Sequence, residues 1–136
     1  MPDQASIATL RAAVEAIVPG SAELRVHDHV AHAVELATPG FVDLIAILLD
    51  AFATDVRVGA AFAELSLPER GEVLRLMTNG ETQDLRDAVD ALFVFTYGGT
   101  YSEWTGYDRA TNTLTPPAVW ATLGYRGPVD GVPDYR

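Results

Sequence analysis

The segment from Phe41 to Ala53 is apolar around almost its whole circumference. It reads FVDLIAILLDAFA, and its only charges, Asp43 and Asp50, are seven residues apart. On a helix these two carboxylates share one narrow face, about 10 Å apart, and protein has to cover the rest. We therefore predict a central helix here, inside an all-α fold. The two carboxylates are better explained as its polar stripe than as a catalytic acid–base pair.

Capping residues and helix breakers divide the rest of the chain into further helices. Proline–glycine pairs at 19–20 and 39–40 end two of them, and Asn79-Gly80 ends another. The predicted helices cover about residues 6–18, 22–36, 41–53, 58–65, 66–77 and 82–96. We expect a single domain over residues 1–136, in which residues 1–96 form a compact bundle of about six helices and residues 97–136 an irregular extension.

The chain is strongly acidic. Nineteen acidic residues stand against nine basic ones, so the formal charge is −10, which repels phosphate backbones and anionic membrane surfaces. We therefore expect no nucleic-acid partner, and the longest apolar runs are too short for membrane insertion. The sequence contains no Cys, which excludes disulfides and thiolate sites. The N-terminus shows neither a signal peptide nor a twin-arginine pair, so we expect a cytoplasmic protein.

One histidine-rich helix turn is the strongest candidate for chemistry. His29, His32 and Glu35 lie close together on a helix, and two imidazoles with a carboxylate can hold a divalent metal. No second segment supplies further ligands, however, and a solvated histidine face explains the pattern better. Phosphate-binding loops and nucleophile elbows are also absent from the sequence. We therefore predict that the chain is not itself an enzyme and holds no cofactor or metal of its own.

The last forty residues differ in composition from the body. All five Tyr and both Trp lie at or after position 97, whereas all five Phe precede it. Tyr and Trp join a large apolar ring to a polar tip, which suits surfaces that a partner covers. We expect Gly98 and Gly99 to end the last long helix. A long irregular connection then leads to a short helix over residues 118–123, which Thr115-Pro116-Pro117 opens and Gly124 ends.

Three stretches of the chain resemble the gluconate 2-dehydrogenase subunit 3 family. They are LRAAVEAIVPG over residues 10–20, YGG over 97–99 and VWATLGYRGP over 119–128, with a looser match over 62–74. The resemblance implies a helical, non-catalytic small subunit that accompanies a large FAD-binding oxidoreductase of the glucose–methanol–choline type and aids its maturation. That family commonly has Asn where Thr100 stands, and it often carries a twin-arginine export signal. This chain shows no such signal, which favours a cytoplasmic pair.

We therefore expect the extension to bind a large FAD-dependent oxidoreductase subunit, with the FAD in that partner. The predicted anchors and turns of this partner-binding site are Tyr97, Gly98, Gly99, Tyr101, Trp104, Trp120, Gly124 and Tyr125. Trp120 has an equally good alternative, since its short helix could pack back on the body. Two other functions stay open: a free-standing helical protein that binds a metal or small ligand, and a homo-oligomeric structural protein whose extension crosses to a symmetry mate.

Overall fold

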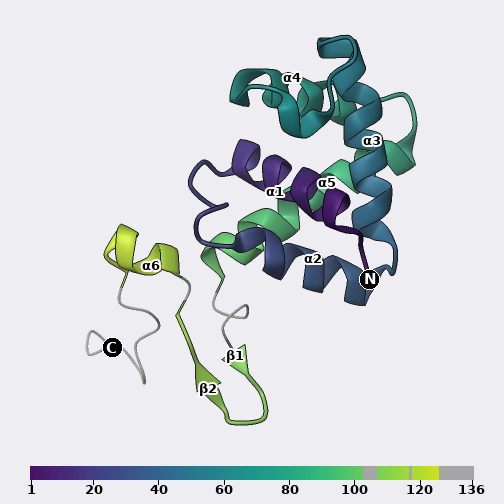
Figure 1. Ribbon diagram of the computed structural model, residues 1–136. Coiled ribbons are helices and arrows are strands. Elements are labelled where there is room, and N and C mark those ends of the chain that lie inside the picture. The colour runs from purple at the N-terminus through teal and green to yellow at the C-terminus, as the bar shows by residue number, and fades with distance from the viewer. Residues whose placement is uncertain (103–106, 117, 126–136) are drawn as a thin grey trace, which may run out of the picture.

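A computed structural model describes residues 1–102, 107–116 and 118–125 of the chain. Within these ranges the fold is all-α, as predicted, with two strands of two residues each as its β-structure. The elements are α1 (Gln4–Ile17), α2 (Val26–Ala37), α3 (Phe41–Val56), the 3-10 helix η1 (Phe62–Glu64), α4 (Leu67–Thr78), α5 (Gln83–Tyr101), β1 (Tyr107–Asp108), β2 (Thr113–Leu114) and α6 (Ala118–Leu123). The first five α-helices form a compact bundle, and the hairpin and α6 extend from one end of it (Figure 1).

The helix at the centre of the bundle is α1, since it packs against α2, α3, α4, α5 and η1. In Figure 1 it runs between α4 and α2. Its Leu10, Ala13 and Val14 side chains are fully buried. The prediction that α3 is the central helix is wrong. Only one face of α3 is buried, whereas Leu44 and Ile47 on another face are 50% and 66% exposed.

Two predicted helices are shorter than the sequence pattern indicates. Helix α2 begins at Val26 and not at residue 22, because Arg25 adopts a left-handed backbone conformation with φ 56°. The helix predicted over 58–65 is reduced to η1, because Gly59 has φ 78° and the Phe62 N–H donates to Asp50 Oδ1 at 2.8 Å. Phe62 is fully buried in the core, so this hydrogen bond fixes η1 to α3.

Helices α1, α2 and α3 end in the same way. In each, an extended C-cap residue donates its N–H to the carbonyl four residues earlier, and a glycine with positive φ follows two residues later. These glycines are Gly20, Gly40 and Gly59, with φ 91°, 84° and 78°. The residue after each glycine donates its N–H back to the C-cap carbonyl, at 3.0, 3.1 and 3.2 Å. We call this C-terminal turn a helix exit. The proline–glycine pairs predict the first two exits from the sequence, whereas the third has Val58 at the position of the proline.

A glutamate completes the first two exits. Glu15 accepts the N–H groups of Gly20 and Ala22, and Glu35 accepts those of Gly40 and Val42, all four at 2.9 Å. Both glutamates stand five residues before the glycine, in the shared pattern E-x-x-x-P-G. The N–H groups that have no backbone acceptor in the turn thus donate to a carboxylate. These hydrogen bonds fix the path of the chain between two successive helices.

Helix α5 does not end at its paired glycines. It continues through Gly98 and Gly99 to Tyr101, and the prediction of a turn there is wrong. A Cβ atom on Gly99 would lie 3.1 Å from Val26 Cγ1 and 3.6 Å from Val30 Cγ2. The glycine therefore serves close packing of α5 on α2. This contact stabilises the last turns of α5 despite a helix-propensity cost of about 1 kcal/mol for a glycine.

Candidate partner-binding site

The exposed end of α5 carries a row of aromatic rings. Phe93, Tyr97 and Tyr101 are spaced four residues apart, and their successive ring centroids are 6.4 Å apart in both pairs. Tyr97 and Tyr101 are 47% and 44% exposed, and Val94 beside them is 66% exposed. We call these four residues the α5 aromatic face. Rings at this spacing interact favourably and hold one another in place, which presents an ordered apolar surface to solvent.

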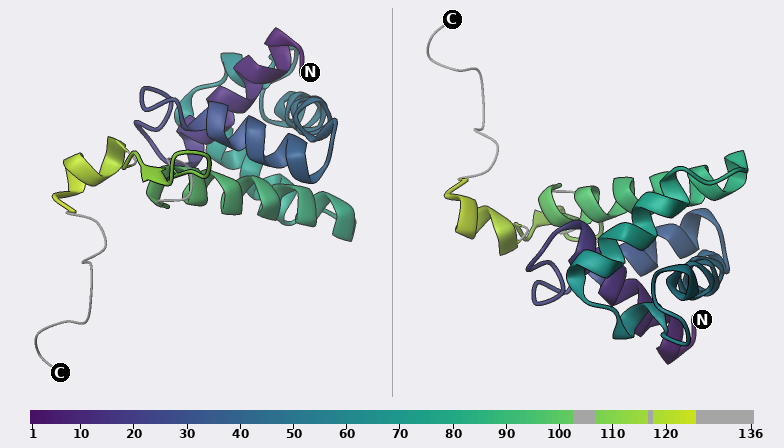
Figure 2. Two further views of the ribbon diagram at one scale, coloured as in Figure 1. Left: turned by 90° about the horizontal axis from the view of Figure 1, so that it is seen from below. Right: turned by 90° about the horizontal axis from the view of Figure 1, so that it is seen from above.

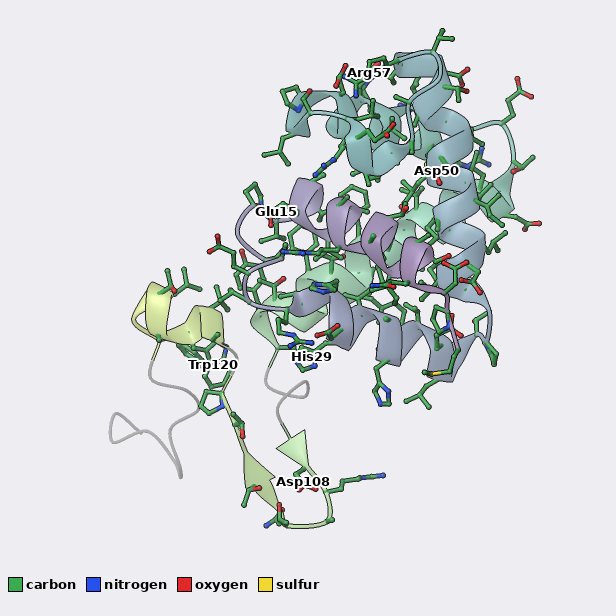
Figure 3. The ribbon with its side chains drawn as sticks, in the orientation of Figure 1. Glu15, His29, Asp50, Arg57, Asp108 and Trp120 are labelled. Atoms are coloured by element: carbon green, nitrogen blue, oxygen red, sulfur yellow. The ribbon has the colours of Figure 1, made fainter. Side chains whose placement is uncertain are left out.

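Trp120 lies on the inner side of α6 and is only 6% exposed. Its indole N–H donates to the Tyr101 carbonyl at 3.0 Å, so α6 is fixed to the last turn of α5. Figure 3 shows Trp120 at the base of α6, beside the end of the bundle. Of the two interpretations of Trp120, the structure therefore agrees with packing on its own chain.

Gly124 reverses the chain after α6 with φ 69°. The reversal lets the Tyr125 N–H donate to the Trp120 carbonyl at 2.9 Å. It also brings the two rings edge to face, 4.7 Å apart between centroids at 84°. Tyr125 nevertheless stays 52% exposed, and Leu123 is 62% exposed. Gly124 is thus a turn, as predicted, and α6 lies beside the C-terminal end of α5 (Figure 2).

The predicted partner-binding residues therefore separate into two groups. Tyr97, Tyr101 and Tyr125 are exposed and lie where a partner could cover them. The other four have structural roles within the chain. Trp120 is buried, Gly99 packs on α2, Gly98 is a half-buried residue of α5, and Gly124 forms a turn. Trp104 lies outside the described residues.

Among the described residues, the histidine-rich turn of α2 does not bring three metal ligands together. His29 and His32 are exposed, but the Glu35 carboxylate is occupied by the N–H groups of Val42 and Gly40, which lower the pKa of Glu35. The described part of the chain contains no group of three or more His, Asp or Glu side chains that could hold a metal ion. His27, by contrast, is buried, and this burial lowers its pKa.

Two carboxylates of α3, Asp43 and Asp50, also have structural partners. Asp43 Oδ1 accepts the Asp3 N–H at 3.3 Å, and Asp50 Oδ1 accepts the Phe62 N–H. Each therefore connects α3 to another segment. Figure 3 shows Asp50 directed from α3 toward the inside of the bundle.

A second surface feature, which the sequence pattern did not predict, is a groove beside the C-terminal half of α3. It has a volume of about 790 Å³ and is bounded by α3, α4, the segment that joins α4 to α5 and the first turn of α5. Its lining residues are Phe52, Asp55, Val56, Glu72, Leu76, Asn79, Gly80, Glu81, Thr82 and Leu85. The sequence feature that could have indicated this groove is the apolar circumference of α3. Where no neighbouring helix covers α3, its exposed apolar side chains form a wall of the groove.

No helix of the described residues is by itself long and apolar enough to span a membrane, although α2 and α3, bent by 115° at their junction, meet the length and composition test together. We compared the chain with protein-family models, with curated proteins and with solved structures, and none of the three comparisons gave a match.

Proposed function

We propose that this chain is a non-catalytic small subunit that binds, and thereby stabilises or matures, a flavin-dependent sugar or alcohol oxidoreductase of the glucose–methanol–choline type. FAD and the catalytic residues belong to the partner in this proposal. The observation that carries it is the α5 aromatic face. The class of partner comes from the sequence resemblance to the gluconate 2-dehydrogenase subunit 3 family.

The aromatic face has the chemistry of a protein interface. Tyrosine is enriched in such interfaces because it buries a large rigid ring while its hydroxyl remains able to form a hydrogen bond. Tyr97 and Tyr101 are held four residues apart on a helix that Gly99 anchors against α2. A partner that covers them orders few additional side chains, which keeps the entropic cost of binding low.

The apolar outer side of α6 enlarges this surface. The hydrogen bond from Trp120 to Tyr101 holds α6 against the end of α5, and Leu123 of α6 and the following Tyr125 are exposed. Two neighbouring elements thus both carry exposed apolar side chains. The described parts of the stretches that carry the resemblance, 10–20, 97–99 and residues 119–125 of 119–128, form the second half and the exit of α1, the contact of α5 with α2, and α6 with its turn.

Co-expression with a large FAD-dependent oxidoreductase of the glucose–methanol–choline type from the same genome tests the proposal. We expect the two proteins to co-purify with FAD bound to the large subunit. Tyr97→Ser combined with Tyr101→Ser should abolish co-purification, because it removes the two exposed rings of the face. Leu36→Ser combined with Val58→Ser is the matched control, since those side chains are 73% and 93% exposed elsewhere on the molecule.

Two results would contradict the proposal. One is a large subunit that is equally soluble and equally loaded with FAD when this chain is left out. The other is a dimer of the isolated chain, seen by light scattering, which the Tyr97 and Tyr101 substitutions convert to monomer. That second result would support the homo-oligomeric alternative.

A further inference from the structure

The groove between α3 and α4 is apolar at its floor. Phe52, Val56, Leu76 and Leu85 line it and are all half-buried, so each shows part of its side chain to solvent. They come from α3, α4 and α5, and Val56 and Phe52 follow one another along the same side of α3. A partner group that fills the groove would remove this apolar surface from water.

The rim of the groove is acidic. Asp55, Glu72 and Glu81 line it, and no Arg or His is among its described lining residues. Glu72 is paired with Arg75 on α4, whereas Asp55 and Glu81 are both exposed. In a chain of formal charge −10, such a rim repels an acidic occupant and attracts a basic one.

The apolar surface continues from the groove along α3. Leu44, Ile47 and Ala51 are exposed on the same helix, at the spacing of one helical face next to Phe52 and Asp55. The elements that pack on α3 are α1, α2, α4 and η1, and they cover its other side. The uncovered region is therefore elongated along a helix.

The walls of the groove favour a helical occupant. An extended peptide binds best to an open sheet edge, where it pairs with free backbone N–H and C=O groups. Here the α3 and α4 walls present side chains only, because their backbone groups are used within the helices, and the wall over residues 79–82 is too short to pair with an extended peptide. A helix that lays apolar residues at i, i+3, i+4 and i+7 into a groove needs no backbone acceptors.

We propose that the α3–α4 groove and the adjoining face of α3 bind an amphipathic helix of a partner protein, whose apolar residues enter the groove and whose Arg or Lys side chains meet Asp55 and Glu81. This surface is separate from the α5 aromatic face. The proposal therefore does not depend on the identity of the flavoprotein partner.

A synthetic helical peptide of about five turns tests this assignment with the full-length chain. The peptide carries Leu at the i, i+3, i+4 and i+7 positions and Arg on both flanks, and its affinity is measured by fluorescence anisotropy. Asp55→Lys with Glu81→Lys should weaken binding at least about tenfold. Glu23→Lys with Asp90→Lys makes the same change in net charge at exposed positions outside the groove, and should weaken it less than about threefold.

A second pair of variants tests whether apolar contacts contribute to binding. Ile47→Ser should reduce the affinity, while Leu36→Ser, at a site of similar exposure on α2, should not. A peptide of the same composition without an apolar face should bind at least about tenfold more weakly. Equal binding of both peptides, equal effects of the two charge-reversal pairs, or the absence of binding would overturn the assignment. Co-purification with the flavoprotein would then still test the aromatic face independently.

Discussion

Single carboxylates and single glycines decide much of this fold at the residue scale. Glu15 and Glu35 each hold two backbone N–H groups, and Asp50 holds a third segment in place through Phe62. These side chains look like ordinary members of an acidic surface when only the sequence is considered. Their hydrogen bonds to backbone could not be predicted, because they depend on the path of the chain after the helix ends.

Glu35 gives a pH-dependent prediction. Hydrogen bonds from Val42 and Gly40 hold the pKa of Glu35 below its ordinary value of 4.5. The ionised carboxylate therefore contributes stability that is present above the unfolded-state pKa and lost as pH falls through the folded-state pKa. We expect Glu35→Gln to lower the free energy of unfolding at neutral pH, and to lower it less in acid, because the wild-type protein also loses the charge there.

Urea unfolding at neutral pH and below about pH 4 measures this difference. Glu23→Gln serves as the control, since Glu23 is exposed. An equal loss of stability at both pH values would show that the carboxylate charge plays no part in the turn.

Gly99 gives a prediction about packing. Val26 and Val30 are buried where they face this glycine, so they have no room to move aside. Gly99→Leu should destabilise the protein by about 1–3 kcal/mol through overpacking. Gly71→Ala in α4 should stabilise it by about 0.5–1 kcal/mol, because no atom lies within 4 Å of the added methyl group. Both values follow from chemical denaturation, and unchanged stability of the Leu variant would contradict the close contact of α5 with α2.

At the scale of elements, the sequence predicts where helices form better than it predicts which of their faces are buried. Pro19-Gly20 and Pro39-Gly40 mark two helix ends correctly. The helix predicted over 66–77 is α4, which a capping box opens: Glu69 accepts the Ser66 N–H. The burial of α3 was overestimated, since an apolar circumference does not reveal which side neighbouring helices leave open. The paired glycines of α5 were misread because local propensity was outweighed by a tertiary contact.

The repeated helix exit leads to a stabilising substitution. Arg57 has φ −143° and ψ 111°, close to Thr38 with φ −144° and ψ 93°, and Thr38 precedes a proline. Val58 is 93% exposed and occupies the position that proline takes in the other two exits. Val58→Pro should therefore raise the free energy of unfolding by about 0.4–1 kcal/mol, because proline restricts the unfolded chain without straining this turn.

Val58→Ala is the control for this prediction, since it removes the valine side chain without restricting the backbone. Thermal and urea unfolding of the two variants separate the effects. A proline variant less stable than the alanine variant would show that the third exit differs from the first two.

On the scale of the whole molecule, the change in composition at residue 97 does not coincide with the end of an element, because α5 continues through it to Tyr101. Exposed Tyr97, Tyr101 and Tyr125 were predicted because tyrosine in an irregular segment indicates surface contact. The inward position of Trp120 could not be decided in advance, since it depends on a hydrogen bond to a carbonyl nineteen residues earlier. The α3–α4 groove could not be predicted for a similar reason, because it depends on how α3, α4 and the start of α5 pack against one another.

The burial of Trp120 also makes its intrinsic fluorescence a probe of the position of α6. The chain has two tryptophans, so a Trp104→Phe protein emits indole fluorescence from Trp120 alone. Indole shielded from water emits at shorter wavelength than indole in water, and we expect the shorter-wavelength emission from the folded variant. A red shift that precedes the loss of helical circular dichroism on heating would show α6 leaving α5 before the bundle unfolds. Emission like that of free tryptophan at the outset would contradict the docking of α6. The wavelength of a single side chain thus reports whether the surface proposed for the partner is assembled before the partner arrives.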